Sequence, residues 1–393
     1  MFGVLRQGPP AETQKTRENS VDHMKLSIER SALLKALSHV QSVVEKRNTI
    51  PILSNVQIEA ADGRLALTAT DLDLAIVEET PADIEQAGAT TVPAHVLHDI
   101  VRKLPEGADV ELALEDQRLR LRAGRSRFTL ACLPREDFPV MSVDELPHRF
   151  TFPAADLKRL IDKTRFAIST EETRYYLNGI YFHVTEGDGG EMLRAVATDG
   201  HRLARVERSA PEGAVGMAGV IVPRKTVLEI RKLIDEFDGE VEISLSDTKI
   251  RYGFDSAVVT SKLIDGTFPD YTRVIPTGND RRLVVSAADF AEAVDRVATI
   301  SSEKSRSVKL ALEAERIVLT VNSPESGTAT EEVAAAYEGE PMEIGFNARY
   351  LLDILDQIEG GEVELLLNDA ASPTVMKDSE DDSALYVLMP MRV

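Results

Sequence analysis

A short stretch in the middle of the chain contains the residue types of a hydrolytic site. It reads ATDGHRLA at residues 197–204 and places Asp199 and His201 on either side of Gly200. An Asp–His pair can perform acid–base chemistry, so one hypothesis is a metal-independent hydrolase that uses Asp199 and His201. Such a site would also need a nucleophile or a metal partner, and the sequence offers no convincing one.

A related stretch nearer the N-terminus changes this interpretation. Residues 69–76 read ATDLDLAI and repeat the Thr-Asp pair, whereas the third copy, TVNSPES at 320–326, keeps neither residue. A Thr-Asp pair shared by two copies is typical of a turn, because an Asp side chain can accept hydrogen bonds from nearby backbone N–H groups. The feature peculiar to 197–204 is Gly-His-Arg at 200–202, which favours binding over catalysis.

The composition excludes several classes of protein and site. The chain has 393 residues, of which 43% are hydrophobic, enough for two to four packed domains. Cys132 is the only cysteine and the seven histidines lack metal-ligand spacing, so we predict no disulfide, no metal, no cofactor and a cytoplasmic location. No apolar run is long enough to cross a membrane. Residues 1–23 are polar and predict a disordered extension, an upstream start codon or a cloning remnant.

Three segments align without gaps and indicate an internal repeat. Each is an alternating strand followed by a helix with apolar residues at i, i+3 and i+4. Ser31, Asp156 and Asp289 are expected to be helix N-caps or first-turn acids. The segments read KLSIERSALLKAL from Lys25, RFTFPAADLKRLI from Arg149 and RLVVSAADFAEAV from Arg282.

A second strand–helix pattern repeats within each third of the chain. It reads TVPAHVLHDIVRKL, IVPRKTVLEIRKLI and IGFNARYLLDILDQI, and each copy is followed by alternating strands with turn signals EDQ, SDT and NDA in register. The expected fold class is α+β: three similar domains, each with two helices packed on antiparallel sheets. Their predicted bounds are 24–147, 148–279 and 280–393. A single β-rich domain with scattered helices is the alternative.

Charge is distributed unevenly between the predicted helices and the rest of the chain. The net charge of −21 alone argues against tight nonspecific binding of nucleic acid, because phosphate binding normally needs clustered Lys and Arg. The predicted helices nevertheless carry 14 Lys and Arg against 13 Asp and Glu. Such a separation suits a channel that holds a polyanion inside an acidic exterior. These helices are expected at 31–46, 94–103, 154–166, 223–236, 287–297 and 347–359.

The most specific stretches of residues 24–393 resemble one family. They are TIPILSNV (49–56), ATTVPA (89–94), RYYLNG (174–179), VATDGHRLA (196–204), IVPRK (221–225), TSKLIDGTFPDYTRV (260–274), MEIGFN (342–347) and YVLMPMRV (386–393). By these stretches the chain resembles the bacterial DNA polymerase III beta subunit family, the replication sliding clamps. The resemblance implies a non-enzymatic processivity factor that encircles duplex DNA, without sequence specificity, as a head-to-tail homodimeric ring. It also implies an ATP-driven clamp loader, the polymerase III alpha subunit and other clamp-motif proteins as partners.

The resemblance further implies a pocket that binds short linear peptides of those partners. Apolar residues would line it, Met would adapt to varied side chains, and Arg, His and backbone groups would orient the polar ends of the peptide. Part of the C-terminal run is also expected to be an ordinary core strand. The implied pocket residues are Leu177, Thr198, Gly200, His201, Arg202, Leu203, Pro269, Arg273, Val274, Asn347, Tyr350, Val387, Leu388, Met389, Pro390, Met391 and Arg392.

The stretch RSRFTL at 125–130 alternates basic and apolar residues, as a strand at a sheet edge does. One interpretation is a solvated edge that charge protects from pairing. The resemblance instead implies a subunit interface between the first domain and the third domain of a partner. GTAT at 327–330 is uncharged where the family has a denser acidic run, which weakens the expected ion pairing across 325–332. The implied interface residues are Arg125, Arg127, Phe128, Leu130, Thr299, Ile300 and Glu325.

For contact with DNA, the resemblance implies Arg47, Tyr176, Arg224 and Lys225, although each Lys or Arg could simply be solvated. Four positions depart from the family: Glu171 and Ser305 near the DNA, and Pro373 and Leu388 near the pocket. We expect polymerase stimulation to be lost when residues 387–393 are deleted from a chain that still dimerises. A monomeric three-domain scaffold without a role on DNA is the remaining alternative.

Overall fold

The computed structural model describes residues 23–142, 145–187, 189–301 and 306–392. They form two compact units, one from residues 23–71 with 77–140 and one from residues 72–76 with the described residues from 141 onward. The predicted extension at 1–23 lies outside the described residues except for its last position. Both the second and the third predicted domains fall within the second unit, so their boundary at 279/280 stays a prediction.

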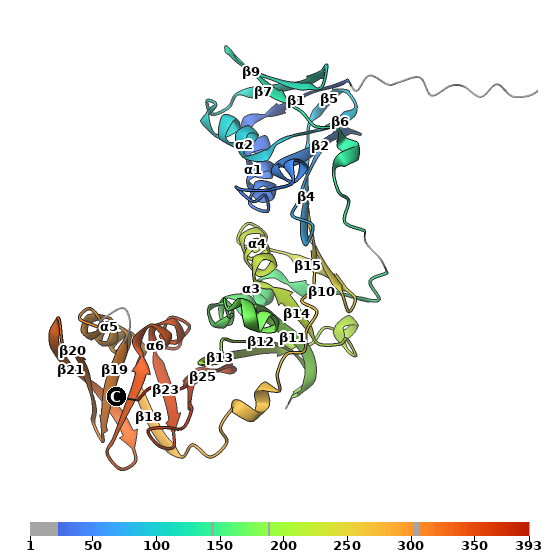
Figure 1. Cartoon of the computed structure of the whole chain (residues 1–393). Coiled ribbons are helices and arrows are strands. Elements are labelled where there is room, and N and C mark those ends of the chain that lie inside the picture. The colour runs from blue at the N-terminus through green and yellow to red at the C-terminus, as the bar shows by residue number, and fades with distance from the viewer. Residues whose placement is uncertain (1–22, 143–144, 188, 302–305, 393) are drawn as a thin grey trace, which may run out of the picture. The chain divides into compact units, whose positions relative to one another are not determined.

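The first unit combines two helices with two sheets (Figure 1). Helices α1 (Arg30–Gln41) and α2 (Ala94–Lys103) pack against each other. The strand orders are β5-β1-β7-β8-β9 and β4-β3-β2-β6. The strands are β1 (Met24–Glu29), β2 (Asn55–Ala61), β3 (Arg64–Thr70), β4 (Leu74–Pro81), β5 (Asp83–Gln86), β6 (Gly88–Pro93), β7 (Asp109–Glu115), β8 (Arg118–Ala123) and β9 (Ser126–Ala131).

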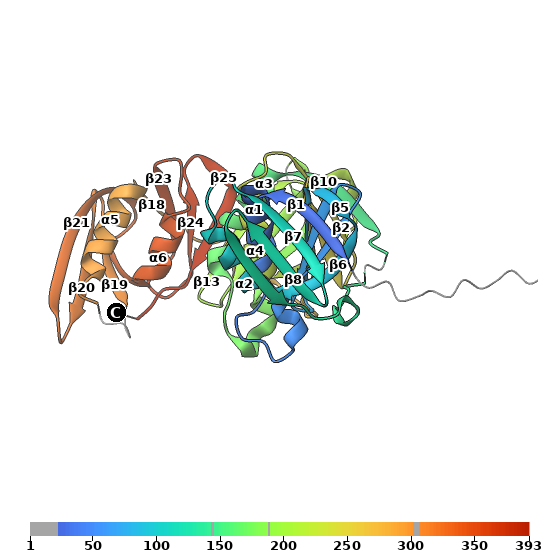
Figure 2. The same ribbon diagram turned by 90° about the horizontal axis from the view of Figure 1, so that it is seen from above.

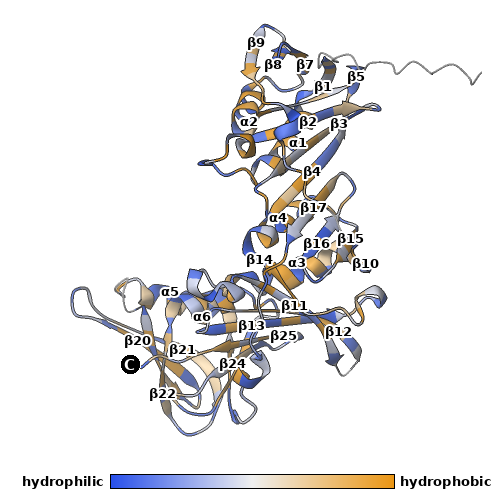
Figure 3. Ribbon diagram, turned by 45° about the vertical axis from the view of Figure 1, so that its right-hand side comes forward, coloured by the Kyte–Doolittle hydropathy of each residue, from blue (hydrophilic) through white to orange (hydrophobic). Residues whose placement is uncertain are grey.

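Alternation of residue types explains why these segments are half-buried strands. In β8, RLRLRA exposes every Arg and buries both Leu and the Ala, because successive side chains of a strand point to opposite faces. The alternation can be followed along the strands in Figure 3. The EDQ turn before β8 holds Asp116 and Gln117 at φ values of 50° and 58°, as a two-residue hairpin turn requires.

The second unit contains four helices in two packed pairs. They are α3 (Ala154–Asp162) with α4 (Arg224–Ile234), and α5 (Ala287–Ala298) with α6 (Ala348–Leu355). Figure 2 shows α5 and α6 beside the strands of the C-terminal part. All six predicted helices are therefore confirmed, although α1, α3, α4 and α6 end earlier than expected. Short 3-10 helices lie at Pro51–Ser54, Arg135–Asp137, Arg165–Ala167, Glu172–Leu177, Glu212–Ala214 and Tyr271–Val274.

The N-cap of the first helix differs from the prediction. Glu29, not Ser31, caps α1, because its carboxylate accepts hydrogen bonds from the N–H groups of Ser31 and Ala32 at 2.8 and 3.1 Å. Asp156 and Asp289 do lie in first turns, where a negative charge favours the helix dipole.

Two sheets complete the second unit. Their strand orders are β10-β15-β16-β17 and β14-β11-β12-β13-β25-β24-β23-β18-β21-β20-β19-β22. The strands are β10 (His148–Pro153), β11 (Gly179–Gly187), β12 (Gly190–Thr198), β13 (Arg202–Ser209), β14 (Val220–Pro223), β15 (Glu240–Leu245), β16 (Lys249–Gly253), β17 (Ala257–Lys262), β18 (Arg281–Ser286), β19 (Ser307–Glu313), β20 (Arg316–Ser323), β21 (Gly327–Glu338), β22 (Met342–Asn347), β23 (Glu362–Leu367), β24 (Thr374–Asp378) and β25 (Asp381–Leu388). The antiparallel pairing of β13 with β25 makes the longer sheet continuous across residue 280.

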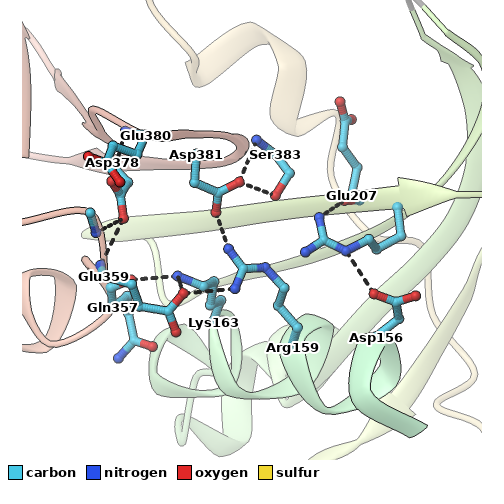
Figure 4. A network of polar contacts seen from close by, with 12 residues as sticks. Asp156, Arg159, Lys163, Glu207, Gln357, Glu359, Asp378, Glu380, Asp381 and Ser383 are labelled. Atoms are coloured by element: carbon cyan, nitrogen blue, oxygen red, sulfur yellow. Dashed lines mark hydrogen bonds and ion pairs between the residues drawn. The ribbon is translucent and has the colours of Figure 1, made fainter. Parts of the chain in front are cut away.

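A network of polar side chains beside α3 also links the residues before 280 to those after it (Figure 4). Arg159 donates to Glu359 at 2.8 Å and to Asp381. The Lys163 ammonium, with a side chain only 3% exposed, donates to the Gln357 carbonyl at 2.6 Å and lies 3.3 Å from Glu359. A buried ammonium needs such partners, because an unpaired charge in the interior is costly. These contacts hold the segment that follows α6 against the C-terminal end of α3.

Candidate functional site

An apolar pocket of about 340 Å³ lies where β13 and β25 pair. Leu203 on β13 is paired with Val387 on β25, and both side chains contribute to the floor together with Leu177. Val274 and Met389 lie at the rim with exposed fractions of 50% and 40%. The lining residues are Arg174, Tyr176, Leu177, Thr198, Gly200, His201, Arg202, Leu203, Pro269, Asp270, Tyr271, Val274, Val387 and Met389.

One wall of the pocket is the segment before β18, which aromatic contacts hold on the sheet. Phe268 stacks on Tyr181 with ring centroids 4.8 Å apart and an interplanar angle of 6°. The Tyr271 ring is buried, and its hydroxyl lies 2.9 Å from His183 Nε2 and accepts a hydrogen bond from Arg194 at 3.2 Å. The wall is therefore fixed before any ligand binds, which lowers the entropy cost of binding.

The turn at residues 198–202 forms the opposite edge. The Thr198 hydroxyl donates to the Arg202 carbonyl at 2.7 Å, and the Asp199 carboxylate accepts from the N–H groups of His201 and Arg202 at 2.9 and 3.1 Å. Gly200 has a φ of +88°, and a Cβ there would meet Arg174 Nη1 at 2.6 Å. The sequence-based assignment of Thr-Asp to a turn is confirmed.

This geometry gives Asp199 no catalytic arrangement with His201. The Asp199 carboxylate bonds the backbone of His201 and the Arg202 guanidinium, whereas the His201 ring stacks on Tyr350 with centroids 6.0 Å apart. A general base must reach the proton that it removes, and here the carboxylate is committed to the turn.

Arg202 is the most heavily engaged side chain at the site and is only 8% exposed. Its guanidinium donates to Asp199 at 3.1 Å, to the Phe166 carbonyl at 2.7 Å and to Asp353 on α6. It also lies 4.3 Å from the Tyr350 ring centroid, within the range of a cation–π contact. Arg202 therefore ties the pocket turn to α6.

The C-terminal run divides between core and surface. Leu388 is fully buried and pairs in the sheet with Arg202 and Thr374. It is not among the residues that line the pocket, contrary to what the resemblance implied. Its neighbours Val387 and Met389 do. Backbone hydrogen bonds from Met389 to His201 at 2.9 Å and from Met391 to Gly345 at 2.8 Å hold the end of the run in place. Pro390, Met391, Arg392 and the solvent-exposed Arg273 lie outside the pocket lining.

A second, polar cleft of about 490 Å³ adjoins the pocket, and His201 and Arg202 line both. It contains Asn347 and Tyr350, two of the residues that the resemblance placed in the pocket. The lining residues are Arg165, Phe166, Ile168, Ser169, Thr170, Glu171, Asp199, His201, Arg202, Arg224, Arg306, Asn347, Arg349, Tyr350 and Asp353. The predicted pocket set is therefore divided between two adjoining cavities.

Four residues of the pocket lining are absent from the predicted pocket set: Arg174, Tyr176, Asp270 and Tyr271. All four lie inside the stretches RYYLNG and TFPDYTRV, so the sequence marked their segments, but it did not show which way their side chains point. The Glu171 carboxylate accepts two hydrogen bonds from Arg174, at 2.8 and 2.9 Å, and these bonds raise the pKa of the Arg174 guanidinium. Hydrogen bonding from Thr272, and the charge of Arg273, lower the pKa of Asp270.

The residues implied for DNA contact lie at different places. Arg47 is exposed in the first unit, and Arg224 and Lys225 begin α4 in the second. Tyr176 lines the apolar pocket and packs edge-on against Tyr175 with centroids 5.7 Å apart. Pro373 precedes β24, and its carbonyl accepts a hydrogen bond from Asn279. Ser305 lies outside the described residues.

The residues implied for a subunit interface lie on two strand edges and beside α5. β9 is the outer strand of its sheet, with Arg125, Arg127 and Phe128 exposed and Leu130 half-buried. Thr299 and Ile300 follow α5, and Glu325 lies in the turn between β20 and β21. Of the residues in β21, only 335–338 pair with β18. In the described ladders, the first half of β21 therefore pairs with β20 on one side and with no strand on the other. Glu331, in that half, accepts a hydrogen bond from the Arg296 guanidinium at 2.6 Å.

Three family models match the chain in succession. They are the N-terminal domain of the DNA polymerase III beta subunit at residues 24–142, its central domain at 151–270 and its C-terminal domain at 272–392. The chain belongs to the DNA polymerase III beta subunit family. This member of the family is therefore built of three clamp domains and functions as a DNA sliding clamp, a non-catalytic processivity factor of replication.

Relatives resemble this clamp over their whole length. The beta sliding clamp of Caulobacter vibrioides is 59% identical over 372 residues, 94% of this chain and 100% of that protein. That of Escherichia coli K12 is 42% identical with the same coverage. A crystal structure of the Caulobacter crescentus clamp has a TM-score of 0.93 at 59% identity and covers 95% of this chain and 100% of that one. A Bartonella birtlesii clamp bound to griselimycin has a TM-score of 0.92 at 53% identity, with 94% and 100% covered.

Among the described residues, no group of three or more His, Cys, Asp or Glu side chains is arranged to hold a metal ion. No helix among them is long and apolar enough to span a membrane.

Proposed function

We propose that the apolar pocket of this clamp binds short peptides of partner proteins, among them the polymerase III alpha subunit and the clamp loader. The observation that supports this most is the preformed cavity of about 340 Å³ with Val274 and Met389 exposed at its rim. Preformed apolar cavities with a few convergent polar groups are typical ligand sites. His201, Arg202 and Arg174 supply those polar groups here.

The ring is the second part of the proposal: in the cytoplasm, two copies close head to tail around duplex DNA. The exposed edge of β9, with Arg127 and Phe128, would pair with the first half of β21 in the partner. Heterologous contacts of this kind close into a ring when the rotation allows it. Because Arg296 neutralises Glu331 within one chain, we expect apolar contact and strand pairing to contribute more to this interface than ion pairs.

A topological link would explain how an acidic chain can stay on DNA. A ring needs no tight phosphate contact, and dense contacts would slow sliding and make it strongly dependent on salt. Arg47, Arg224 and Lys225 would supply weak contacts to the duplex. The three domains would have the bounds 24–147, 148–279 and 280–393.

The ring is tested by mass and by topology. Multi-angle light scattering should give the mass of a dimer, and clamp loaded on nicked circular DNA should be released when the circle is cut. Phe128→Glu should give a monomer, whereas Val96→Glu, which alters another exposed apolar residue on α2 (48% exposed, against 36% for Phe128), should not. A dimer that survives Phe128→Glu, or a clamp retained on linear DNA, would contradict the proposal.

The pocket is tested with a matched pair of valine variants. Val274 at the rim and Val215 elsewhere in the second unit are 50% and 46% exposed, so an Asp at either position should be tolerated by the fold. Val274→Asp should abolish peptide binding and polymerase stimulation, and Val215→Asp should change neither. For the truncation, Val387 and Leu388 are buried in β25, so deletion should start at Met389 to spare the sheet. Full stimulation by Val274→Asp would refute the pocket.

A further inference from the structure

The polar cleft beside the pocket carries a surplus of arginine charge. Arg224, Arg306 and Arg349 reach it from α4, from the residue before β19 and from α6. Within the described part of the chain, none of these three guanidinium groups forms an ion pair with a carboxylate. Unpaired guanidinium groups gathered around one concave site form an anion site, because their planar forks match carboxylate oxygens.

The acids of the cleft already pair with cations other than these three arginines, and two of the acids share one guanidinium. Asp199 and Asp353 are held by Arg202, and Glu171 is held by Arg174. Arg165, a further cation of the cleft, pairs with Asp162 at 3.1 Å. Arg306 and Arg349, which the proposed DNA contacts do not use, are thus available to a peptide anion, and Arg224 is the one arginine of the cleft that the two proposals share.

The cleft is continuous with the apolar pocket. His201 and Arg202 line both cavities, and Tyr350 stacks on His201 from the cleft side. An extended peptide advances about 3.3 Å per residue, so residues a few positions from its apolar anchor would reach the cleft. A side chain on such a peptide can enter a recess, whereas the phosphates of a stiff duplex stay on the surface of the duplex.

We propose that this cleft binds carboxylate side chains that flank the apolar anchor of a docking peptide. The inference rests on the proposed peptide pocket and adds a selectivity to it: acidic flanks bind more tightly than neutral ones, and basic flanks bind least. Because the three arginines are at least partly solvated, the selectivity weakens as salt screens it.

The test uses three labelled twelve-residue peptides with the same Leu-Leu anchor, flanked on both sides by Glu, Gln or Lys. Their affinities for the full chain are measured by fluorescence anisotropy at low and high salt. We expect the Glu peptide to bind about threefold to tenfold more tightly than the Gln peptide at low salt, as for partly exposed ion pairs. The double variant Arg306→Gln/Arg349→Gln should remove this preference and leave the affinity for the Gln peptide unchanged.

Arg251→Gln is the matched control, because Arg251 is an exposed arginine of β16 outside both cavities. It should keep the preference for Glu. Equal binding of the Glu and Gln peptides by the wild-type chain, or a preference that persists in the double variant, would overturn the inference while leaving the pocket standing. If the double variant lost retention on nicked circular DNA but kept the preference for the Glu peptide, the cleft would be assigned to DNA instead. No binding of the Gln peptide at all would overturn the pocket and the inference together.

Discussion

Replacing Arg202 with Met tests whether this side chain holds the pocket turn on α6. The substitution keeps most of the volume but leaves Asp199, Asp353 and the Phe166 carbonyl without their common donor. Removing one partner of a buried ion pair costs about 3–5 kcal/mol. Asp353 is one-third exposed and Asp199 keeps two backbone donors, so we expect the lower end of that range, about 3 kcal/mol.

The effect should be local, so the assay should be local as well. A chain with two compact units need not unfold in one step, and a global midpoint would mix their contributions. Hydrogen exchange measured on peptides from α6 and β13 reports the free energy of opening at the junction itself. A loss of about 3 kcal/mol corresponds to exchange that is about 150-fold faster.

Two controls bracket the result. Asp353→Asn keeps the Arg202–Asp199 pair and should accelerate exchange by less than about tenfold, because the lost partner is partly solvated. Arg251→Met, on the exposed face of β16, should leave exchange at the junction unchanged. If Arg202→Met accelerates exchange by less than about threefold, the cost of desolvating the Arg202 guanidinium offsets the stability that its contacts provide, and the reasoning is wrong.

Three further perturbations follow from the same geometry. Gly200→Ala should weaken peptide binding about tenfold, since an L-residue at φ +88° costs about 1–2 kcal/mol and its Cβ displaces Arg174; wild-type affinity by anisotropy would contradict this. Lys163→Met should speed hydrogen exchange around Gln357 about tenfold, because the Gln357 carbonyl and the Glu359 carboxylate lose their donor. Unchanged exchange would mean that the network in Figure 4 contributes nothing to the stability of this region. Burial opposes ionisation of Asp378, but three backbone N–H donors outweigh it and hold its pKa below the usual value. The stability that this carboxylate contributes is thus present above about pH 4 and is lost as pH falls through the lowered pKa, and an Asp378→Asn variant should show a smaller acid loss in thermal melts.

Much of the fold followed from patterns within short windows of sequence. Apolar residues at helical spacing gave the positions of all six helices, and RLRLRA in β8 alternates as a half-buried strand must. The repeat also corrected a local signal, because the second copy of Thr-Asp identified Asp199 as a turn residue before its hydrogen bonds were known. RSRFTL was likewise recognisable as an edge strand, and β9 is one.

The direction and partners of individual side chains needed the tertiary structure. Val387 and Leu388 are apolar, buried neighbours in one strand, and only the packing of β25 beside β13 decides that Val387 lines the pocket while Leu388 does not. The resemblance implied that Arg202 orients a bound peptide, yet its guanidinium is buried against Asp353, which stands 151 positions away in sequence. Helix and strand signals are local because they depend on backbone periodicity, whereas a pocket or a buried ion pair depends on which distant segments pack together, and no window of sequence contains both sides of that contact.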